Sequence, residues 1–394
     1  MEDHLRPFLA VARQLRSRGH EVVFYSDTKS APMIELSGFR CFPFQKMDPA
    51  PLHHILWQLR SQNPKRLLVW RLWREFLLDS IPGQLEDLRS IAAEWRPNVV
   101  VSDVSMWSTF LVLHESEGIP VVPFSATAHC LIPGPDGPMS GMALPRPVAV
   151  LCKIAAQAGS RVADLMTRSV LRQANKFRAD NFLTPLTCSV KQQSSRMPLY
   201  LVSSSPHFDR MRKDLPDTVQ YIGPCFEDAL GFPLRHRGDS GTLPARVLID
   251  RGMPFARPRF LQLASSSLSG LNVESEFGDA FSLFASLPSA NLVMTNGNSA
   301  MVLAALAHGI PLLVVPDSRH CSENAWRVHE QGAGIRISQC LSNFHVLRKA
   351  VQQILGSDIF PRNARLVAES FRVQGGASRA AELIEKAALT PACV

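Results

Sequence analysis

Apolar positions along the chain follow two spacings, one typical of amphipathic helices and one typical of short buried strands. From Leu5 to Leu15 they recur at helical spacing, with Pro7 in the first turn and Gly19 as the stop. The segment that follows, HEVVFYS (residues 20–26), has the apolar centre of a strand buried on both faces. A helix that leads into such a strand is half of a βαβ crossover, the unit from which parallel sheets are built.

The same alternation recurs through the chain and predicts a doubly wound α/β fold. PNVVVSD (97–103) is typical of a strand, WSTFLVLHESEG (107–118) of a helix and IPVVPFS (119–125) of the next strand. Later segments with the same apolar character predict more buried strands at residues 198–205, 245–252, 291–297 and 310–316.

Length and local composition predict two domains. A chain of 394 residues is long for one ordinary core. Between Gly223 and Pro244 it turns rich in Gly, Pro, Asp and Arg and loses its periodicity, as an interdomain linker does. We therefore predict an N-terminal domain over residues 1–222, a linker over 223–243 and a C-terminal domain over 244–394. The C-terminal domain should end in a helix from roughly Asn363 to Ala388.

Composition excludes several classes of protein. Apolar residues make up 46% of the chain, which indicates a globular fold. The net charge is +8, but Lys and Arg are scattered and form no nucleic-acid module. The eight cysteines include no C-x-x-C pair, which argues against a metal site and favours a reducing, cytoplasmic location. An amphipathic stretch with arginines at residues 64–81 favours a helix packed on its domain over peripheral contact with a membrane.

Four segments carry a resemblance to a known family. HLRPFLAVARQLRSRGHEVVFYS (4–26) resembles the amino-terminal G-H-x-x-P and R-G-H-x-V signature of UDP-glycosyltransferases of the macrolide and natural-product type. VVVSDVSMWSTFLVLHESEGIPVVPFS (99–125) and DLPDTVQYIGPCF (214–226) look like later parts of the family's N-terminal domain. TNGNSAMVLAALAHGIPLLVVPDSRHCSENAWRVHEQGAGIRI (295–337) is similar to its donor-binding signature.

The resemblance implies the GT-B fold, in which two Rossmann-like, doubly wound parallel-sheet domains face a cleft. It also implies an inverting hexosyltransferase of secondary metabolism. In this family a hydroxyl of a small lipophilic acceptor, held in the N-terminal domain, attacks the anomeric carbon of a UDP-sugar held mostly in the C-terminal domain. The UDP-sugar is a co-substrate, and the family needs no metal and no further cofactor, because a helix N-terminus meets the diphosphate.

Two residues are implied as catalytic. His4 falls where the family keeps its general base, and Asp103 falls where it keeps the carboxylate that orients this base. An imidazole with a pKa near neutrality can accept a hydroxyl proton, and a carboxylate on its other nitrogen stabilises the imidazolium. The plain structural alternatives are that His4 lies in a frayed terminus and that Asp103 only caps the following helix.

The last segment implies the donor site. In the family a turn and the start of the next helix present backbone amides to the diphosphate, and residues further on complete the site. The implied residues are Thr295, Asn296, Gly297, Asn298 and Ser299 at the turn, and His320, Cys321, Glu323 and Asn324 further on. Alternatively, Glu323 and Asn324 only stabilise the amino end of a helix.

The sequence also departs from the family pattern. Asn298 stands in place of the second glycine, and Met301 stands where a small or hydroxyl residue contacts phosphate. His320 and Cys321 replace the Asp-Gln pair that binds sugar hydroxyls. The strand that precedes the family's first helix has no counterpart, so we expect an N-terminal sheet without its central strand. We also expect a C-terminal domain shortened between residues 252 and 272.

These departures leave three functions open. The first is the sugar transfer described above, and the second is a non-catalytic or repurposed relative that keeps the acceptor cleft but binds donor weakly or not at all. The third is different chemistry in the same cleft, such as that of a cyclase or isomerase that uses His4 or His320.

Overall fold

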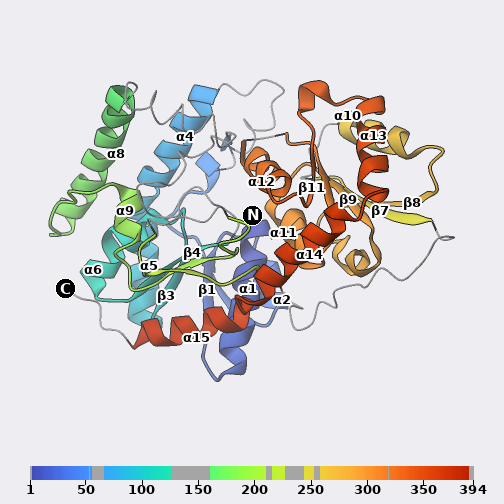
Figure 1. The fold of residues 1–394 in the computed structure, drawn as a ribbon. Helices are drawn as coiled ribbons and strands as arrows, with labels where there is room; N and C mark the ends of the chain where they lie inside the picture. Colours follow the sequence, from blue (N-terminus) through green and yellow to red (C-terminus); the bar gives the residue numbers. More distant parts are fainter. Residues whose placement is uncertain are drawn as a thin grey trace.

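The computed structural model consists of two α/β halves, each built on parallel strands (Figure 1). It describes residues 2–52, 54–55, 66–126, 160–209, 215–226, 244–252, 258–317 and 319–389. Every segment predicted as a strand contains one. The doubly wound parallel architecture expected from the sequence is therefore confirmed. The predicted linker lies outside the described residues from position 227 onward, so the domain limits stay a prediction.

The N-terminal half carries two sheets. Their strands are β1 (Val23–Ser26) paired with β2 (Arg40–Pro43), and β3 (Val100–Asp103), β4 (Val121–Ser125), β5 (Tyr200–Val202) and β6 (Val219–Tyr221) in that spatial order. The helices are α1 (Glu2–Ser17), α2 (Ala31–Leu36), α4 (Arg66–Asp79), α5 (Ile81–Trp95), the π-helix η1 (Thr109–Leu113), α6 (His114–Glu117), α8 (Ser160–Asp180) and α9 (Val190–Ser194).

One helix, α1, packs on both of these sheets. Leu5 and Leu9 lie in a cluster with Phe24 of β1, whereas Val11 lies in a cluster with Phe124 of β4. Within the described residues β1 pairs only with β2, and β3 pairs only with β4. The described strands of the N-terminal half are thus divided between two sheets, β1–β2 and β3–β6, and the expected lack of a central strand stays a prediction. The shared helix holds the two parts together.

The C-terminal half carries a single sheet of five parallel strands. Their spatial order is β11 (Gly334–Arg336), β10 (Leu312–Val314), β9 (Leu292–Thr295), β7 (Ala245–Asp250) and β8 (Val273–Gly278). The helical elements are α10 (Pro258–Leu268), the 3-10 helix η2 (Phe284–Ser289), α11 (Ser299–Ala307), α12 (Arg319–Glu330), the 3-10 helix η3 (Gln339–Leu341), α13 (Phe344–Leu355), α14 (Ile359–Arg372) and α15 (Gly376–Ala388).

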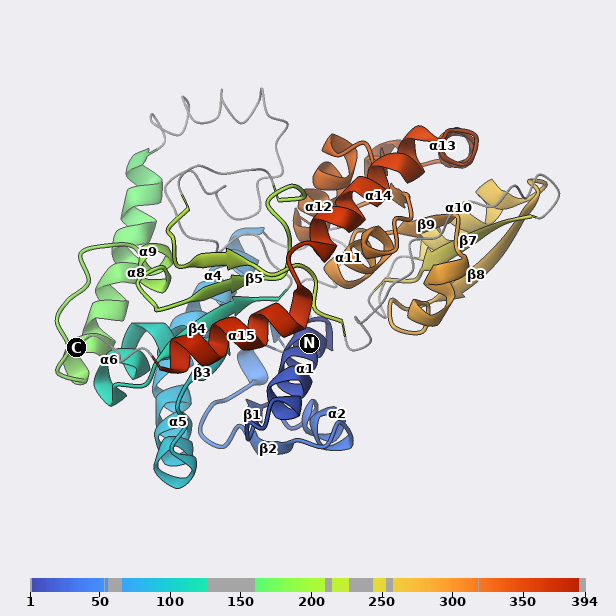
Figure 2. The same cartoon turned by 60° about the horizontal axis from the view of Figure 1, so that its bottom comes forward.

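The prediction of a single final helix over residues 363–388 is wrong. The chain forms α14 and α15 instead, and they are separated at Gly375, whose φ of 87° no helix interior accepts. The break lets α15 turn back onto the N-terminal half, where it lies beside α1 (Figure 2). Ala380 and Ile384 pack in one cluster with Val11, and Glu385 accepts hydrogen bonds of 2.7–2.8 Å from Arg18.

The amphipathic stretch at residues 64–81 forms α4 over its central part. This helix packs against α5 and α8, and Phe76 and Leu78 are buried. The structure thus favours the packed-helix interpretation of this stretch. None of the helices in the described ranges is long and apolar enough to cross a membrane.

A short segment of the N-terminal half, directly after β5, packs into the C-terminal half. Phe208 is fully buried in the core of the C-terminal half, where its ring lies 5.6 Å from that of Phe371. The next residue, Asp209, accepts a 2.9 Å hydrogen bond from Arg327 of α12 and a 3.0 Å bond from Tyr221. The side chains of Arg327 and Asp209 are only 7% and 8% exposed. The contact is therefore a buried ion pair between the halves.

Replacing one partner of this pair should destabilise the protein strongly. In Arg327→Met the Asp209 carboxylate stays buried without its cation, which lowers the free energy of unfolding by about 3–5 kcal/mol. Urea denaturation followed by circular dichroism measures the loss. Arg372→Met is the matched control, since Arg372 is 53% exposed in its pair with Glu369 and such pairs contribute about 0–1 kcal/mol. Equal losses in the two variants would contradict a stabilising role for the buried pair.

Candidate active site

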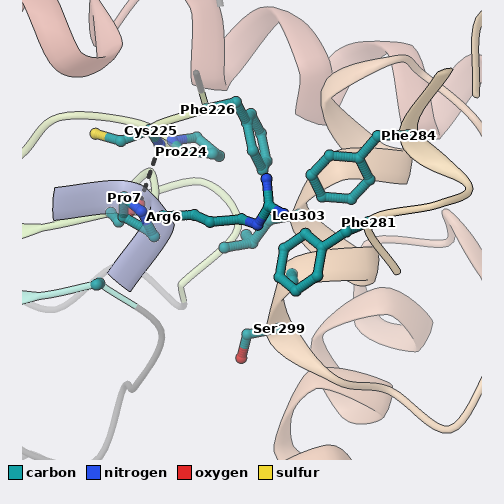
Figure 3. Close-up of a pocket in the computed structure, with 12 residues that line it drawn as sticks. Arg6, Pro7, Pro224, Cys225, Phe226, Phe281, Phe284, Ser299 and Leu303 are labelled. Carbon is teal, nitrogen blue, oxygen red and sulfur yellow. Dashed lines mark hydrogen bonds between the residues drawn. The ribbon is translucent and has the colours of Figure 1, made fainter. Parts of the chain in front are cut away.

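The carboxyl ends of the strands in both halves point toward one region, and a pocket lies there (Figure 3). Its walls come from both halves of the chain: Arg6, Pro7, Ala126, Ser203, Pro224, Cys225 and Phe226 on one side, and Phe281, Phe284, Ser299, Ala300 and Leu303 on the other. The guanidinium carbon of Arg6 lies 4.0 Å from the ring centre of Phe281, which is a cation–π contact across the two halves. The lining is otherwise mostly apolar.

His4 and Asp103 lie in direct contact, although 99 residues separate them in the sequence. The Nδ1 atom of His4, in the first turn of α1, is 2.8 Å from Oδ2 of Asp103 at the end of β3. His4 is 49% exposed and Asp103 is 18% exposed, so the pair borders solvent. His4 belongs to α1, whose packing on both sheets fixes its position. This geometry is the one required of a base and its orienting carboxylate.

Asp103 is held by its own loop as well as by His4. Its Oδ1 atom accepts hydrogen bonds from the Ser105 amide at 2.8 Å and the Ser105 hydroxyl at 2.5 Å. Burial opposes ionisation of Asp103, but the charge of His4 and the hydrogen bonds from His4 and Ser105 hold the pKa of its carboxyl below the usual value. Asp103 therefore stabilises the local turn and carries the negative charge that faces the imidazole.

The lowered pKa of Asp103 predicts how its contribution to stability depends on pH. The folded state binds a proton at Asp103 less readily than the unfolded state, whose Asp pKa is about 3.9, so the contribution is complete above that value. It is lost as the pH falls through the lower pKa of the folded state. The difference in melting temperature between wild type and Asp103→Asn should thus be largest at neutral pH and shrink below about pH 4. A constant difference at all pH values would assign the effect to packing instead.

The turn after β9 brings most of the implied donor residues together. Gly297 has a φ of 93°, and a Cβ at this position would lie 2.8 Å from the carbonyl oxygen of Cys321. Asn324 of α12 donates to the Gly297 carbonyl at 2.9 Å and to the Ser299 hydroxyl at 3.1 Å. Only glycine fits this close approach of the turn to α12 without strain.

The polar groups of this turn are engaged with one another and with two carboxylates. Thr295 donates its hydroxyl to Asp250 at 2.7 Å, and Asn296 donates to Asp317 at 2.9 Å. Asn298 accepts from the Met301 amide at 2.9 Å, so its side chain caps α11, and its amide group donates to Asp250. Hydrogen-bond donors expected to face a diphosphate thus have partners inside the protein.

Several implied residues take other positions. The Met301 side chain is fully buried in the core of the C-terminal half, and its backbone amide, in the first turn of α11, donates to Asn298. Glu323 lies 3.9 Å from Arg327, near the ion pair between the halves. Cys321 is buried against the turn, and His320 is the second residue of α12, with a side chain outside the described part of the structure. Across the described ranges no group of three or more metal-ligating side chains could hold a metal ion.

Sequence reasoning missed Asp250, Asp317 and Arg6. Asp250 ends a strand that the sequence did predict, and the carboxyl end of a parallel strand is the position at which side chains reach a ligand. That signal was available for Asp250. Arg6 carried no comparable signal, since its role depends on Phe281 in the other half.

Comparisons with known proteins show which proteins the chain resembles in sequence and in fold. Residues 272–384 match the family described as "Erythromycin biosynthesis protein CIII-like, C-terminal domain". The chain is 24% identical to 4'-demethylrebeccamycin synthase of Lentzea aerocolonigenes, over 98% of this chain and 96% of the relative. It is 23% identical to demethyllactenocin mycarosyltransferase of Streptomyces fradiae, over 97% and 83% of the two chains. The spinosyn rhamnosyltransferase SpnG complexed with thymidine diphosphate superposes with a TM-score of 0.69 at 18% identity, over 98% of this chain and 97% of that one.

Proposed function

We propose that the chain transfers a sugar from a nucleoside-diphosphate sugar to a hydroxyl of a small lipophilic acceptor. The support is that the chain is homologous to natural-product glycosyltransferases and shares their GT-B fold. The sequence signature favours UDP, while the thymidine diphosphate complex of SpnG makes TDP the other base to test. The aromatic lining of the pocket, with Phe226, Phe281 and Phe284, supports an apolar acceptor.

The contact between His4 and Asp103 carries the proposal. With a proton on Nδ1 donated to Asp103, the Nε2 atom of His4 carries the lone pair that takes the acceptor's hydroxyl proton. The acceptor oxygen then bonds to the anomeric carbon from one face while the bond to the diphosphate oxygen breaks on the other, so the configuration inverts. The Asp103 carboxylate stabilises the imidazolium that forms, since its lowered pKa keeps it ionised.

The turn from Thr295 to Ser299 is proposed to receive the leaving diphosphate. It precedes α11 at the carboxyl end of the sheet, where helix amides attract anions. Asn324 and Cys321 contact the turn from α12 and keep its shape. This assignment uses no metal, because backbone and amide donors meet the developing charge.

The base assignment predicts a selective loss of turnover. His4→Ala should reduce the rate of sugar transfer by about 10²- to 10⁴-fold, the usual contribution of a general base, with the affinity for nucleoside diphosphate nearly unchanged. Product formation with a panel of hydroxylated apolar acceptors measures the rate. His20→Ala is a matched control, since His20 also pairs with a carboxylate, Glu385, at 2.7 Å and is similarly exposed. Equal rates in wild type and His4→Ala would place the base elsewhere.

A binding protein without transferase activity is the second candidate. One observation favours it: the donor turn's hydroxyl and amide groups already bond to Asp250, Asp317 and each other. A diphosphate that enters must replace such bonds, and each lost contact reduces the binding free energy by about 1–3 kcal/mol. Donor affinity therefore separates the two candidates.

Thermal shift with millimolar UDP-glucose, UDP or TDP tests donor binding. A ligand at a hundred times its Kd stabilises the fold by about 2.7 kcal/mol, which raises the melting temperature by a few degrees. For a transferase we expect such a shift, and we expect Asn296→Ala to abolish it. Asn343→Ala removes the cap of α13 instead and should leave the shift intact. The absence of a shift with every nucleotide sugar would favour the binding protein.

A further inference from the structure

Ser105 lies in the turn that follows β3, two residues after Asp103. Its backbone amide and its hydroxyl both donate to the same oxygen of Asp103, Oδ1, at 2.8 Å and 2.5 Å. The other oxygen, Oδ2, is 2.8 Å from Nδ1 of His4. The last torsion of an aspartate side chain is otherwise broadly distributed. Two donors at Oδ1 restrict this torsion and keep Oδ2 directed at the imidazole.

Ser105 is itself held in place by the chain around it. The Met106 amide donates to the Asp103 carbonyl at 2.9 Å, and the Trp107 amide donates to the Ser105 carbonyl at 3.1 Å. The Trp107 side chain is buried in the hydrophobic cluster that also contains Phe110 of η1. The turn therefore connects a buried helical segment to the candidate base, and its contacts fix the position of the Ser105 hydroxyl.

The hydroxyl of Ser105 acts separately from the turn. The amide hydrogen bond alone forms such a turn, in which an aspartate accepts from the residue two positions later. The hydroxyl adds a second donor to the same oxygen, and hydrogen bonds to a charged group are stronger than those between neutral groups. Burial opposes ionisation of Asp103, and this hydroxyl is one of the contacts, together with His4, that hold the pKa of the carboxyl below its usual value.

We infer that Ser105 is a positioning residue of the candidate active site: its hydroxyl keeps Asp103 directed at His4 and so keeps the imidazole in the tautomer that can act as a base. The inference rests on the proposed function, because it serves the base assigned there. A carboxylate that accepts from Nδ1 selects the tautomer with the proton on Nδ1 and the lone pair on Nε2. A carboxylate that rotates away from the imidazole selects this tautomer less strongly.

Nitrogen NMR of the imidazole tests the inference without any need for sugar transfer. Ser105→Ala and Ser105→Gly remove the hydroxyl and retain the amide donor, whereas Ser105→Thr retains both. The His4 signals are assigned by comparison with His4→Gln, and spectra are recorded at about pH 8, where an ordinary imidazole is neutral. We expect wild type and Ser105→Thr to carry the proton on Nδ1. The ratio of the two tautomers should fall about three- to tenfold in the variants without the hydroxyl.

Turnover provides the second measurement. Ser105→Ala should lower kcat about three- to tenfold and leave KM and nucleoside diphosphate affinity unchanged, because the oriented base acts only in the transition state. The same change should cause no further loss in an Asp103→Asn background, since the hydroxyl acts through the carboxylate. Ser195→Ala is the matched control. The Ser195 hydroxyl is also half-buried in a turn, donates to the Gln192 carbonyl at 2.7 Å, and its removal should change neither the tautomer ratio nor kcat.

The outcomes distinguish the inference from the proposed function. Circular dichroism establishes which variants are folded, and two variants without the hydroxyl keep the test valid if one of them is not. An unchanged tautomer ratio overturns the role of Ser105 whether or not the protein transfers sugar. A changed ratio with a kcat equal to that of wild type also overturns it. If wild type transfers no sugar from any UDP- or TDP-sugar but the ratio falls in the variants, the proposed function is overturned and the orientation of His4 by Ser105 stands.

Discussion

The insertion of residues 205–209 into the core of the C-terminal half is the constraint on which the rest of the structure depends. Phe208 packs there against Phe371, and the buried ion pair of Asp209 with Arg327 fixes the path of this segment. The chain then returns through α15, which packs on α1. Two independent crossings, one from each half, resist rotation of the halves more than either alone. The pocket between them consequently has walls whose positions are set by buried contacts.

Helix α1 is held by these contacts and in turn positions the candidate catalytic residue His4. α1 carries His4 and Arg6 on its first turns, packs on both N-terminal sheets and is covered by α15. A frayed terminus could not hold an imidazole 2.8 Å from a carboxylate on a separate strand. The position of His4 is therefore a consequence of helix packing more than of its own hydrogen bond. Arg6, on the same helix, makes a cation–π contact with Phe281 across the pocket.

Apolar patterning was enough to predict the buried strands, because central parallel strands are apolar at every position. It was not enough for the edge strand β8, whose sequence VESEFG is polar over its three central residues, or for the break between α14 and α15, where Gly375 interrupts otherwise continuous helical spacing. The resemblance singled out residues 295–299, which the structure places in one turn, and their role in donor binding stays a prediction. It did not predict that they bond to Asp250, since that contact joins strands that only the folded sheet makes neighbours.

Two carboxylates lie at the carboxyl ends of strands, one in each half, and their environments differ. Asp103 is partly exposed and faces the imidazole of His4, and its contacts with His4 and Ser105 hold the pKa of its carboxyl below the usual value although burial opposes this. Asp250 is fully buried and accepts hydrogen bonds from Thr295, Asn298 and Gly252, so it helps to hold the turn after β9 in its shape. The proposed base is thus held at a border with solvent, where an acceptor can reach it, while the proposed donor turn is built on a carboxylate that solvent does not reach.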